Sequence, residues 1–240
     1  MRDLAENLAD IRRRIAGAAA RRSFSSPLPG LIAVSKTFPD HAVINAALAG
    51  QRDFGESYLQ EALAKIPAVE AAVEMPLCWH FIGPIQSNKT AAIASHFDWV
   101  HGVDRLKIAE RLSAQRPETR PPLNVCLQVN ISGEASKSGC DPVEAPELCA
   151  EIARLPRLRL RGLMAVPAPV EHPEQARPAF RALRQLFEQI RALAAVQLED
   201  FDTLSMGMSD DFEIAIEEGA TWVRIGSAIF GARPKTALPA

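Results

Sequence analysis

The sequence lacks the features that would direct a protein to a membrane, out of the cell or to nucleic acid. No apolar run approaches the length of a membrane span, and the chain begins with charged residues in a helical pattern where a signal peptide would have an apolar core. The formal net charge is only -2, so no general field attracts a polyanion. We therefore expect a soluble cytoplasmic protein that binds neither membranes nor nucleic acids.

Cysteine is also scarce. The four cysteines form no C-x-x-C pair and have no zinc-type spacing with the five histidines. This pattern predicts reduced thiols and no metal site, with Cys78 and Cys126 packed in or beside strands. His80 lies inside a predicted strand, which favours a hydrogen-bonded core residue over a ligand.

What the sequence does contain is a regular alternation of helical and strand patterns. An amphipathic helix is predicted within residues 1–22. Eight short strand-like runs follow, each with a helical pattern behind it, at residues 31–37, 52–56, 78–83, 98–102, 124–130, 160–166, 203–206 and 222–226. Eight parallel crossovers in 240 residues predict an α/β fold, a (β/α)8 TIM barrel with an extra N-terminal helix, as a single domain over residues 1–240.

Local signals also predict where several helices begin and end. Pro67 is expected to end the helix that follows the second strand. Asp141 and Glu144 have the spacing of a capping box at a helix start. A further helix is expected from Ser209 to Glu218.

Lys36 stands at the carboxyl end of the first predicted strand, which follows the breaker at residues 27–30. In a parallel barrel this end of the strands forms the mouth where ligands bind. A lysine amine that is partly desolvated there loses its charge more readily, and the neutral amine condenses with an aldehyde or ketone to form a Schiff base. The alternative is a surface lysine that caps the strand.

Two turns that contain glycine and serine follow the seventh and eighth strands. They span residues 205–210 and 224–227, and each leads into a predicted helix. Loops at these two positions of a barrel often hold a phosphate with backbone N–H groups and a helix dipole. The pair therefore indicates an anion site, and the alternative is that each serine only caps its helix.

Arg224 interrupts an otherwise apolar strand. A buried charge is costly unless it is paired or faces a polar cavity. Two explanations stay open: a salt bridge inside the barrel, for example to Glu56 or Asp210, or a donor aimed at a ligand. An imine-forming lysine, a phosphate site and a buried arginine together match the aldehyde, phosphate and pyridine nitrogen of pyridoxal 5'-phosphate (PLP).

Six segments of the chain resemble the pyridoxal-phosphate homeostasis protein family, the YggS/PROSC-like proteins, in the same order along the chain. They are AVSKT (33–37), FGESY (54–58), WHFIGPIQSNK (79–89), RGLM (161–164), LSMGMSD (204–210) and VRIGSAIFG (223–231). The resemblance implies an alanine-racemase-type barrel that binds PLP and has no established catalytic turnover.

The resemblance also implies a set of cofactor residues, which are Lys36, Ser57, Met164, Ser205, Met208, Arg224, Gly226 and Ser227. Lys36 would form the Schiff base and Arg224 would face the pyridine nitrogen. Ser205, Gly226 and Ser227 would hold the phosphate. The two methionines would lie near the ring. The family usually has asparagine where this chain has Ser57, and the shorter serine would need a water to reach the cofactor.

Two functions of different kinds remain: a carrier for PLP homeostasis and delivery to PLP-dependent apoenzymes, or a racemase-like enzyme. The related racemases supply a tyrosine from an added β-domain across a dimer. This chain ends nine residues after Gly231 and has one tyrosine, Tyr58, so we expect no such domain and a monomer. An arginine opposite the pyridine nitrogen also keeps that nitrogen unprotonated, which favours the carrier.

A class I aldolase-type barrel is a third alternative, because it uses the same lysine chemistry. Such barrels usually place the imine lysine on a later strand, whereas Lys36 follows the first. Further lysines, such as Lys89, Lys137 and Lys235, are candidates for secondary cofactor binding.

Overall fold

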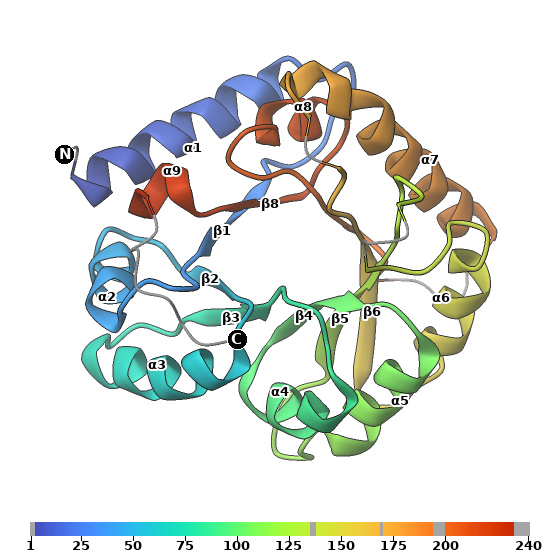
Figure 1. Ribbon diagram of the computed structural model, residues 1–240, viewed down its shortest axis with the longest axis horizontal. Coiled ribbons are helices and arrows are strands. Elements are labelled where there is room, and N and C mark those ends of the chain that lie inside the picture. Colours follow the sequence, from blue (N-terminus) through green and yellow to red (C-terminus); the bar gives the residue numbers. More distant parts are fainter. Residues whose placement is uncertain (1–2, 135–137, 169, 194–199, 233–240) are drawn as a thin grey trace.

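Helices and strands alternate along the chain and enclose one closed sheet (Figure 1). The computed structural model describes residues 3–134, 138–168, 170–193 and 200–232. The strands are β1 (Gly30–Val34), β2 (Asp53–Glu56), β3 (Cys78–Phe81), β4 (Trp99–Val103), β5 (Leu123–Gln128), β6 (Leu158–Met164), β7 (Thr203–Ser205) and β8 (Trp222–Ile225). The helices are α1 (Leu4–Ala20), α2 (Asp40–Leu48), α3 (Leu59–Ala72), α4 (Thr90–His96), α5 (Leu106–Gln115), α6 (Ala145–Ala153), α7 (Arg177–Leu193), α8 (Phe212–Glu217) and α9 (Ser227–Phe230), with short 3-10 turns η1 (Ser87–Lys89) and η2 (Pro173–Ala176).

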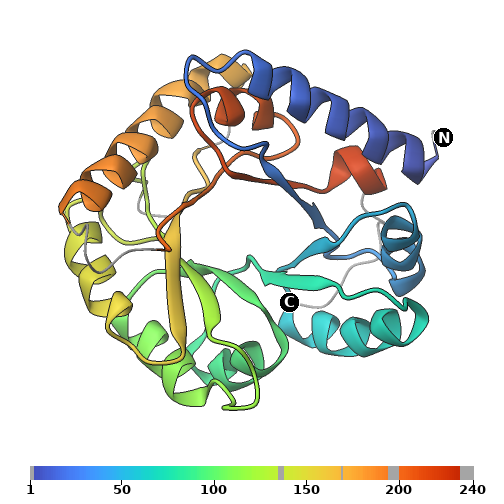
Figure 2. The same ribbon diagram turned by 180° about the vertical axis from the view of Figure 1, so that it is seen from behind.

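The eight strands pair in chain order, and β8 pairs with β1 to close the barrel. Every neighbouring pair is parallel. The helices surround the sheet, as the view from behind also shows (Figure 2). This arrangement confirms the predicted (β/α)8 barrel with an extra N-terminal helix. Within the described residues, no helix is both long enough and apolar enough to cross a membrane.

The extra helix α1 lies on the outside of the barrel beside α8 and α9 (Figure 1). Its buried stripe consists of Leu8, Ile11, Ile15 and Ala18. The arginines of this helix lie mostly on its other faces, and Arg14 pairs with Glu213 of α8 at 3.0 Å. The helix therefore covers the outer side of the closure between β1 and β8.

Alternate strand residues contribute to two separate cores, because successive side chains point to opposite faces of a sheet. In β3, Trp79 and Phe81 belong to the large core between the sheet and the helices. His80 points the other way, into the barrel, where its ring lies 5.6 Å from that of Trp99 and 5.3 Å from that of Trp222. The inside of the barrel thus holds aromatic and polar groups together.

Helix α3 passes through Pro67, where the sequence predicted its end. Pro67 is exposed, whereas Val69 and Val73 beyond it are buried. A proline inside a helix removes one hydrogen bond and strains the preceding turn. Burial of the apolar residues beyond Pro67 offsets this cost. The predicted helix end was wrong because the local sequence does not show this tertiary packing.

Two other helices begin later than predicted. The N–H of Val143 donates to Asp141 Oδ1 at 2.9 Å, and the N–H of Asp141 donates to Glu144 Oε2 at 3.3 Å. These bonds form in a turn, and α6 starts only at Ala145. Similarly, α8 starts at Phe212 because the Asp211 carboxylate holds the preceding residues in a turn by accepting from the Met208 N–H at 2.6 Å.

We expect Gly162→Ala to lower the free energy of unfolding by about 3 kcal/mol, because overpacking a closed sheet displaces backbone. Gly162 has φ of 153°, and a Cβ there would collide with the carbonyl oxygen of Thr203 on β7. Urea unfolding measures the change.

The matched control is Gly133→Ala. Gly133 also has a positive φ, 67°, but a Cβ there meets nothing within 4 Å. Backbone strain alone is expected to lower the free energy of unfolding of Gly133→Ala by about 1 kcal/mol. Equal losses at the two positions would contradict the role assigned to the Thr203 contact.

Candidate functional site

The mouth of the barrel brings together Lys36 and the loops after the last strands. Lys36 is half-buried two residues beyond β1, and its Nζ lies 6.0 Å from the centre of the Tyr58 ring. Gly226 follows β8 and lies against β1, where a Cβ on it would be 3.2 Å from the carbonyl oxygen of Val34. Closure of the barrel therefore places the predicted imine lysine next to the predicted phosphate loop.

The backbone on both sides of Lys36 is held by charged side chains of α3. Lys65 Nζ donates to the carbonyl oxygen of Ser35 at 2.8 Å. The N–H of Thr37 donates to Glu61 Oε1 at 2.7 Å. Thr37 has φ of 69°, a left-handed conformation that a β-branched residue rarely adopts. These two bonds fix the direction in which the Lys36 side chain leaves the strand.

Lys65 is the centre of a buried ionic cluster between the sheet and α3. Its Nζ lies 2.8 Å from Glu56 Oε1 and 2.6 Å from Glu61 Oε1, and the Ser35 hydroxyl also donates to Glu56 at 2.7 Å. Burial raises the pKa of Glu56 against the opposing effect of Lys65. Sequence reasoning missed this cluster, although the Glu61 and Lys65 spacing of four residues on one helix was a visible signal.

Arg224 lies inside the barrel and is 4% exposed. Its Nη1 donates to Ser205 Oγ at 2.7 Å and its Nη2 to the carbonyl oxygen of Ala165 at 2.8 Å. Burial lowers the pKa of Arg224 to about 10, with the Asp211 carboxylate opposing this shift. The guanidinium is therefore still charged near neutral pH.

The salt bridge considered for Arg224 does not form within the described part of the chain. Glu56 faces outward and pairs with Lys65, and Asp210 makes no ion pair with the arginine. The two bonds of Arg224 use two of the five N–H groups of a guanidinium. A buried cation with this donor capacity fits a ligand atom that accepts a hydrogen bond.

Hydroxyl and amide groups meet where the loops after β7 and β8 approach each other. The Ser227 hydroxyl donates to Ser209 Oγ at 3.2 Å, and both groups lie at the surface of the mouth. Gly226 precedes α9, whose first turn leaves the N–H groups of Ser227 and Ala228 without partners in the helix. This donor set suits a phosphate. The sequence predicts Ser209 in a turn and at the start of a helix, but Ser209 is not among the predicted cofactor residues.

Ser205 lies deeper than the other predicted phosphate residues. It ends β7, is fully buried, and its Oγ contacts Arg224 and His101 at 2.7 and 2.9 Å. The structure thus brings its hydroxyl to the arginine inside the barrel.

The remaining predicted residues come from separate strands. Met164 ends β6 and is buried with Trp99 and Cys126 in the inner cluster. Met208 is 39% exposed on the loop after β7. Ser57 is half-buried directly after β2. Among the secondary lysines, Lys89 ends η1 and is half-buried, whereas Lys137 and Lys235 lie outside the described residues.

A polar path inside the barrel was not anticipated. His80 Nε2 lies 3.1 Å from Asp53 Oδ1, and His80 Nδ1 lies 3.0 Å from His101 Nε2. Asp53, Cys78 and His80 also bring their ligand atoms within 4.8 Å of one another, as a cation site would require. The hydrogen bond between His80 and Asp53 accounts for part of this grouping, and burial, with the nearby carboxylates of Asp53 and Asp98, raises the pKa of the Cys78 thiol. The one signal in the sequence was that Cys78 and His80 are two residues apart in a predicted strand, so their side chains share a face.

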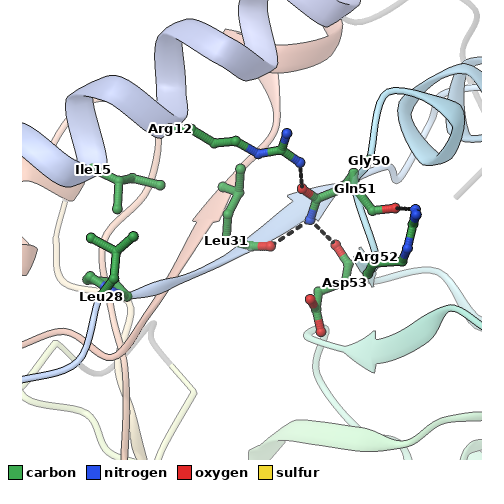
Figure 3. Close-up of a pocket in the computed structure, with 9 residues that line it drawn as sticks. Arg12, Ile15, Leu28, Leu31, Gly50, Gln51, Arg52 and Asp53 are labelled. Carbon is green, nitrogen blue, oxygen red and sulfur yellow. Dashed lines mark hydrogen bonds between the residues drawn. The ribbon is translucent and has the colours of Figure 1, made fainter.

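A pocket of about 320 Å³ lies at the opposite, amino-terminal end of the barrel (Figure 3). It is lined by Arg12, Ile15, Leu28, Pro29, Leu31, Gly50, Gln51, Arg52 and Asp53. Gln51 lines one side of it and donates to the carbonyl oxygens of Leu31 and Asp53 at 2.7 and 2.8 Å (Figure 3). The predicted cofactor residues are not part of this lining. The pocket does bring solvent to Asp53, whose side chain is 27% exposed.

Comparison with known proteins identifies the family. The pattern of the family described as "Alanine racemase, N-terminal domain" matches residues 3–234. A pyridoxal phosphate homeostasis protein of Pseudomonas aeruginosa is 58% identical over 233 residues, which cover 97% of both chains. This chain belongs to the pyridoxal phosphate homeostasis family. The Escherichia coli K12 member is 53% identical over 97% of this chain and 98% of its own.

Solved structures agree with this assignment. PipY of Synechococcus elongatus PCC7942, solved with PLP bound, is 36% identical and superposes with a TM-score of 0.82 over 95% of this chain and all of that one. Alanine racemase of Corynebacterium glutamicum is 19% identical with a TM-score of 0.66, and the match covers 98% of this chain but 63% of the racemase. The racemase likeness supports the barrel type alone. The predicted family and the predicted alanine-racemase-type barrel are both confirmed.

Replacing Lys65 by methionine is expected to lower the free energy of unfolding by about 3 kcal/mol near neutral pH, because it leaves buried carboxylates without their cation. The loss should be smaller in mild acid. Glu56 has a raised pKa, so its proton stabilises the folded state in acid and this contribution is lost as pH rises through the folded pKa. Removing Lys65 raises that pKa further. Denaturant titrations near neutral pH and in mild acid measure the loss in the free energy of unfolding under each condition.

The control is Lys107→Met on the exposed face of α5, which should change stability by about 0.5 kcal/mol or less. A Lys65→Met loss that is independent of pH would show that the carboxylates do not cause it.

Proposed function

We propose that this protein holds PLP as a Schiff base on Lys36 and acts as an intracellular carrier in PLP homeostasis. The observation that carries the proposal is the convergence of three groups at one mouth: the half-buried amine of Lys36, the buried guanidinium of Arg224, and the hydroxyl and amide groups around Ser227. The names of the relatives and the PLP-bound structure of PipY support it.

The proposed phosphate site uses the loops after β7 and β8. PLP supplies an aldehyde that condenses with a lysine amine and a phosphate that needs several hydrogen-bond donors. Ser209 and Ser227 offer hydroxyls, and the first turn of α9 offers N–H groups. Gly226 keeps this backbone close to β1. Ser205 contributes through Arg224, to which its hydroxyl is bonded.

Arg224 is the proposed partner of the pyridine nitrogen. It is charged and buried, and its bonds to Ser205 and Ala165 hold the guanidinium in one orientation. A cationic donor beside the pyridine nitrogen disfavours a proton on that nitrogen, which weakens the ring as an electron sink. Met164 and Met208 would bound the ring, and Ser57 would reach it through a water.

The same features favour a carrier over an enzyme. Tyr58, Met208 and Ser227 are exposed at the mouth, so a bound cofactor can leave for an acceptor. We propose PLP-dependent apoenzymes as acceptors, and a cytoplasmic, monomeric, single-domain protein as the carrier. A racemase-like activity is the second candidate, because the one tyrosine of the chain lies beside Lys36.

Lys36→Ala is expected to abolish the covalent adduct, because the nearby amine of Lys65 is buried on the outer side of the sheet and paired with Glu56 and Glu61. The measurement is a visible absorbance spectrum after incubation with PLP, followed by borohydride reduction and peptide mapping. Lys89→Ala is the matched control at another strand of the same mouth and should keep the adduct on Lys36. An unchanged imine spectrum in Lys36→Ala would reject the assignment.

Tyr58→Phe is expected to leave transfer of PLP to an apoenzyme unchanged, because the carrier role gives its phenol no proton to move. Recovery of activity by a PLP-dependent apoenzyme measures transfer, and circular dichroism checks the fold. Loss of transfer in a folded variant, or loss of a measurable amino-acid racemisation, would instead support the racemase-like candidate.

A further inference from the structure

A continuous line of hydrogen bonds crosses the barrel from Asp53 to Arg224. Four contacts make it up. Asp53 Oδ1 to His80 Nε2 is 3.1 Å, His80 Nδ1 to His101 Nε2 is 3.0 Å, His101 Nδ1 to Ser205 Oγ is 2.9 Å, and Ser205 Oγ to Arg224 Nη1 is 2.7 Å. The side chains between the two ends are fully buried. One end meets solvent at the pocket of Figure 3, and the other lies beneath the proposed cofactor.

Only one donor-to-acceptor direction along this line of hydrogen bonds satisfies the groups at both ends. Arg224 has no acceptor atom and donates to Ser205, and the Asp53 carboxylate accepts from His80. Between them the Ser205 hydroxyl donates to His101 Nδ1, and His101 Nε2–H donates to His80 Nδ1. Both histidines are then neutral, with the proton on Nε2.

The reverse direction is unfavourable. It would put a second proton on His80, a ring buried between Trp99 and Trp222. It would also leave the Ser205 hydroxyl hydrogen without an acceptor among the described residues. Burial, together with the positive charge of Arg224, lowers the pKa of His101, which agrees with a neutral ring.

We propose that Asp53, His80, His101 and Ser205 are positioning residues that form a one-way hydrogen-bond chain and hold Arg224 toward the pyridine nitrogen. This proposal rests on the proposed PLP function. The opposite charges at the two ends polarise every bond of the chain in the same sense, so the bonds strengthen one another. A carboxylate at one end of the barrel thereby helps to orient the cation at the other.

The direction of the chain is tested first in the cofactor-free protein. Nitrogen-15 NMR of the histidine rings, assigned with single-histidine variants, distinguishes protonated from non-protonated ring nitrogens. We expect His80 and His101 to carry a proton on Nε2 and none on Nδ1. A proton on Nδ1 of either ring, or on both nitrogens of His80, would overturn the proposal.

Asp53→Asn tests what sets the direction, because an asparagine has the same shape and its amide can donate as well as accept. We expect Nδ1-protonated forms of both histidines to appear. Asp202→Asn is the control. Asp202 lies at the same end of the barrel, and it pairs with Arg161, which is not part of the proposed hydrogen-bond chain. Identical histidine spectra in Asp53→Asn and the wild type would overturn the role of Asp53.

Coupling to Arg224 is tested with PLP. We expect Asp53→Asn to weaken PLP binding about five-fold, the effect of one lost or misdirected hydrogen bond, and to shift the Schiff-base absorbance as Arg224→Gln does. If Asp53 acts through the arginine, the double variant should lose no more than Arg224→Gln alone. Additive losses would contradict the chain. Absence of PLP binding by the wild type would reject the proposed function while leaving the NMR result intact.

Discussion

Pairing of β8 with β1 is the contact on which the candidate site depends. It sets Arg224 opposite Ile32 and brings Gly226 against Val34. The last strand therefore returns its arginine and its serine turn to the lysine that follows the first strand. Parallel pairing also directs all strand ends to one mouth. Without closure, these groups would belong to opposite edges of an open sheet.

Strand alternation divides the charged residues of the site into two systems. Glu56 of β2 faces outward and joins Lys65 and Glu61 of α3, which hold the backbone around Lys36. Asp53 of the same strand joins the path of His80 inside the barrel. The outer system positions the amine, and the inner one contacts the arginine. Each buried charge has a direct partner, Lys65 for the carboxylates of Glu56 and Glu61 and Ser205 for Arg224, which lowers the cost of burying it.

Sequence patterns predicted the barrel because hydrophobic periodicity and strict alternation leave few other topologies. They also pointed to Lys36, Arg224 and the serine turns, because the ends of parallel strands share a mouth. Sequence patterns did not predict contacts between side chains that are far apart along the chain. Pro67 lies inside a helix because buried valines follow it, and Arg224 pairs with Ser205 and not with Glu56 because Glu56 faces the other side of the sheet.

The sequence by itself determined the order of the strands and helices, the family and the residues at the mouth, since these follow from local periodicity and short motifs. Only the tertiary structure decided which buried polar groups meet. Asp53, His80, His101 and Ser205 come from four different strands, and their contacts arise when closure of the barrel brings those strands around one interior. A hydrogen bond depends on distance and direction in space, which spacing along the chain does not encode.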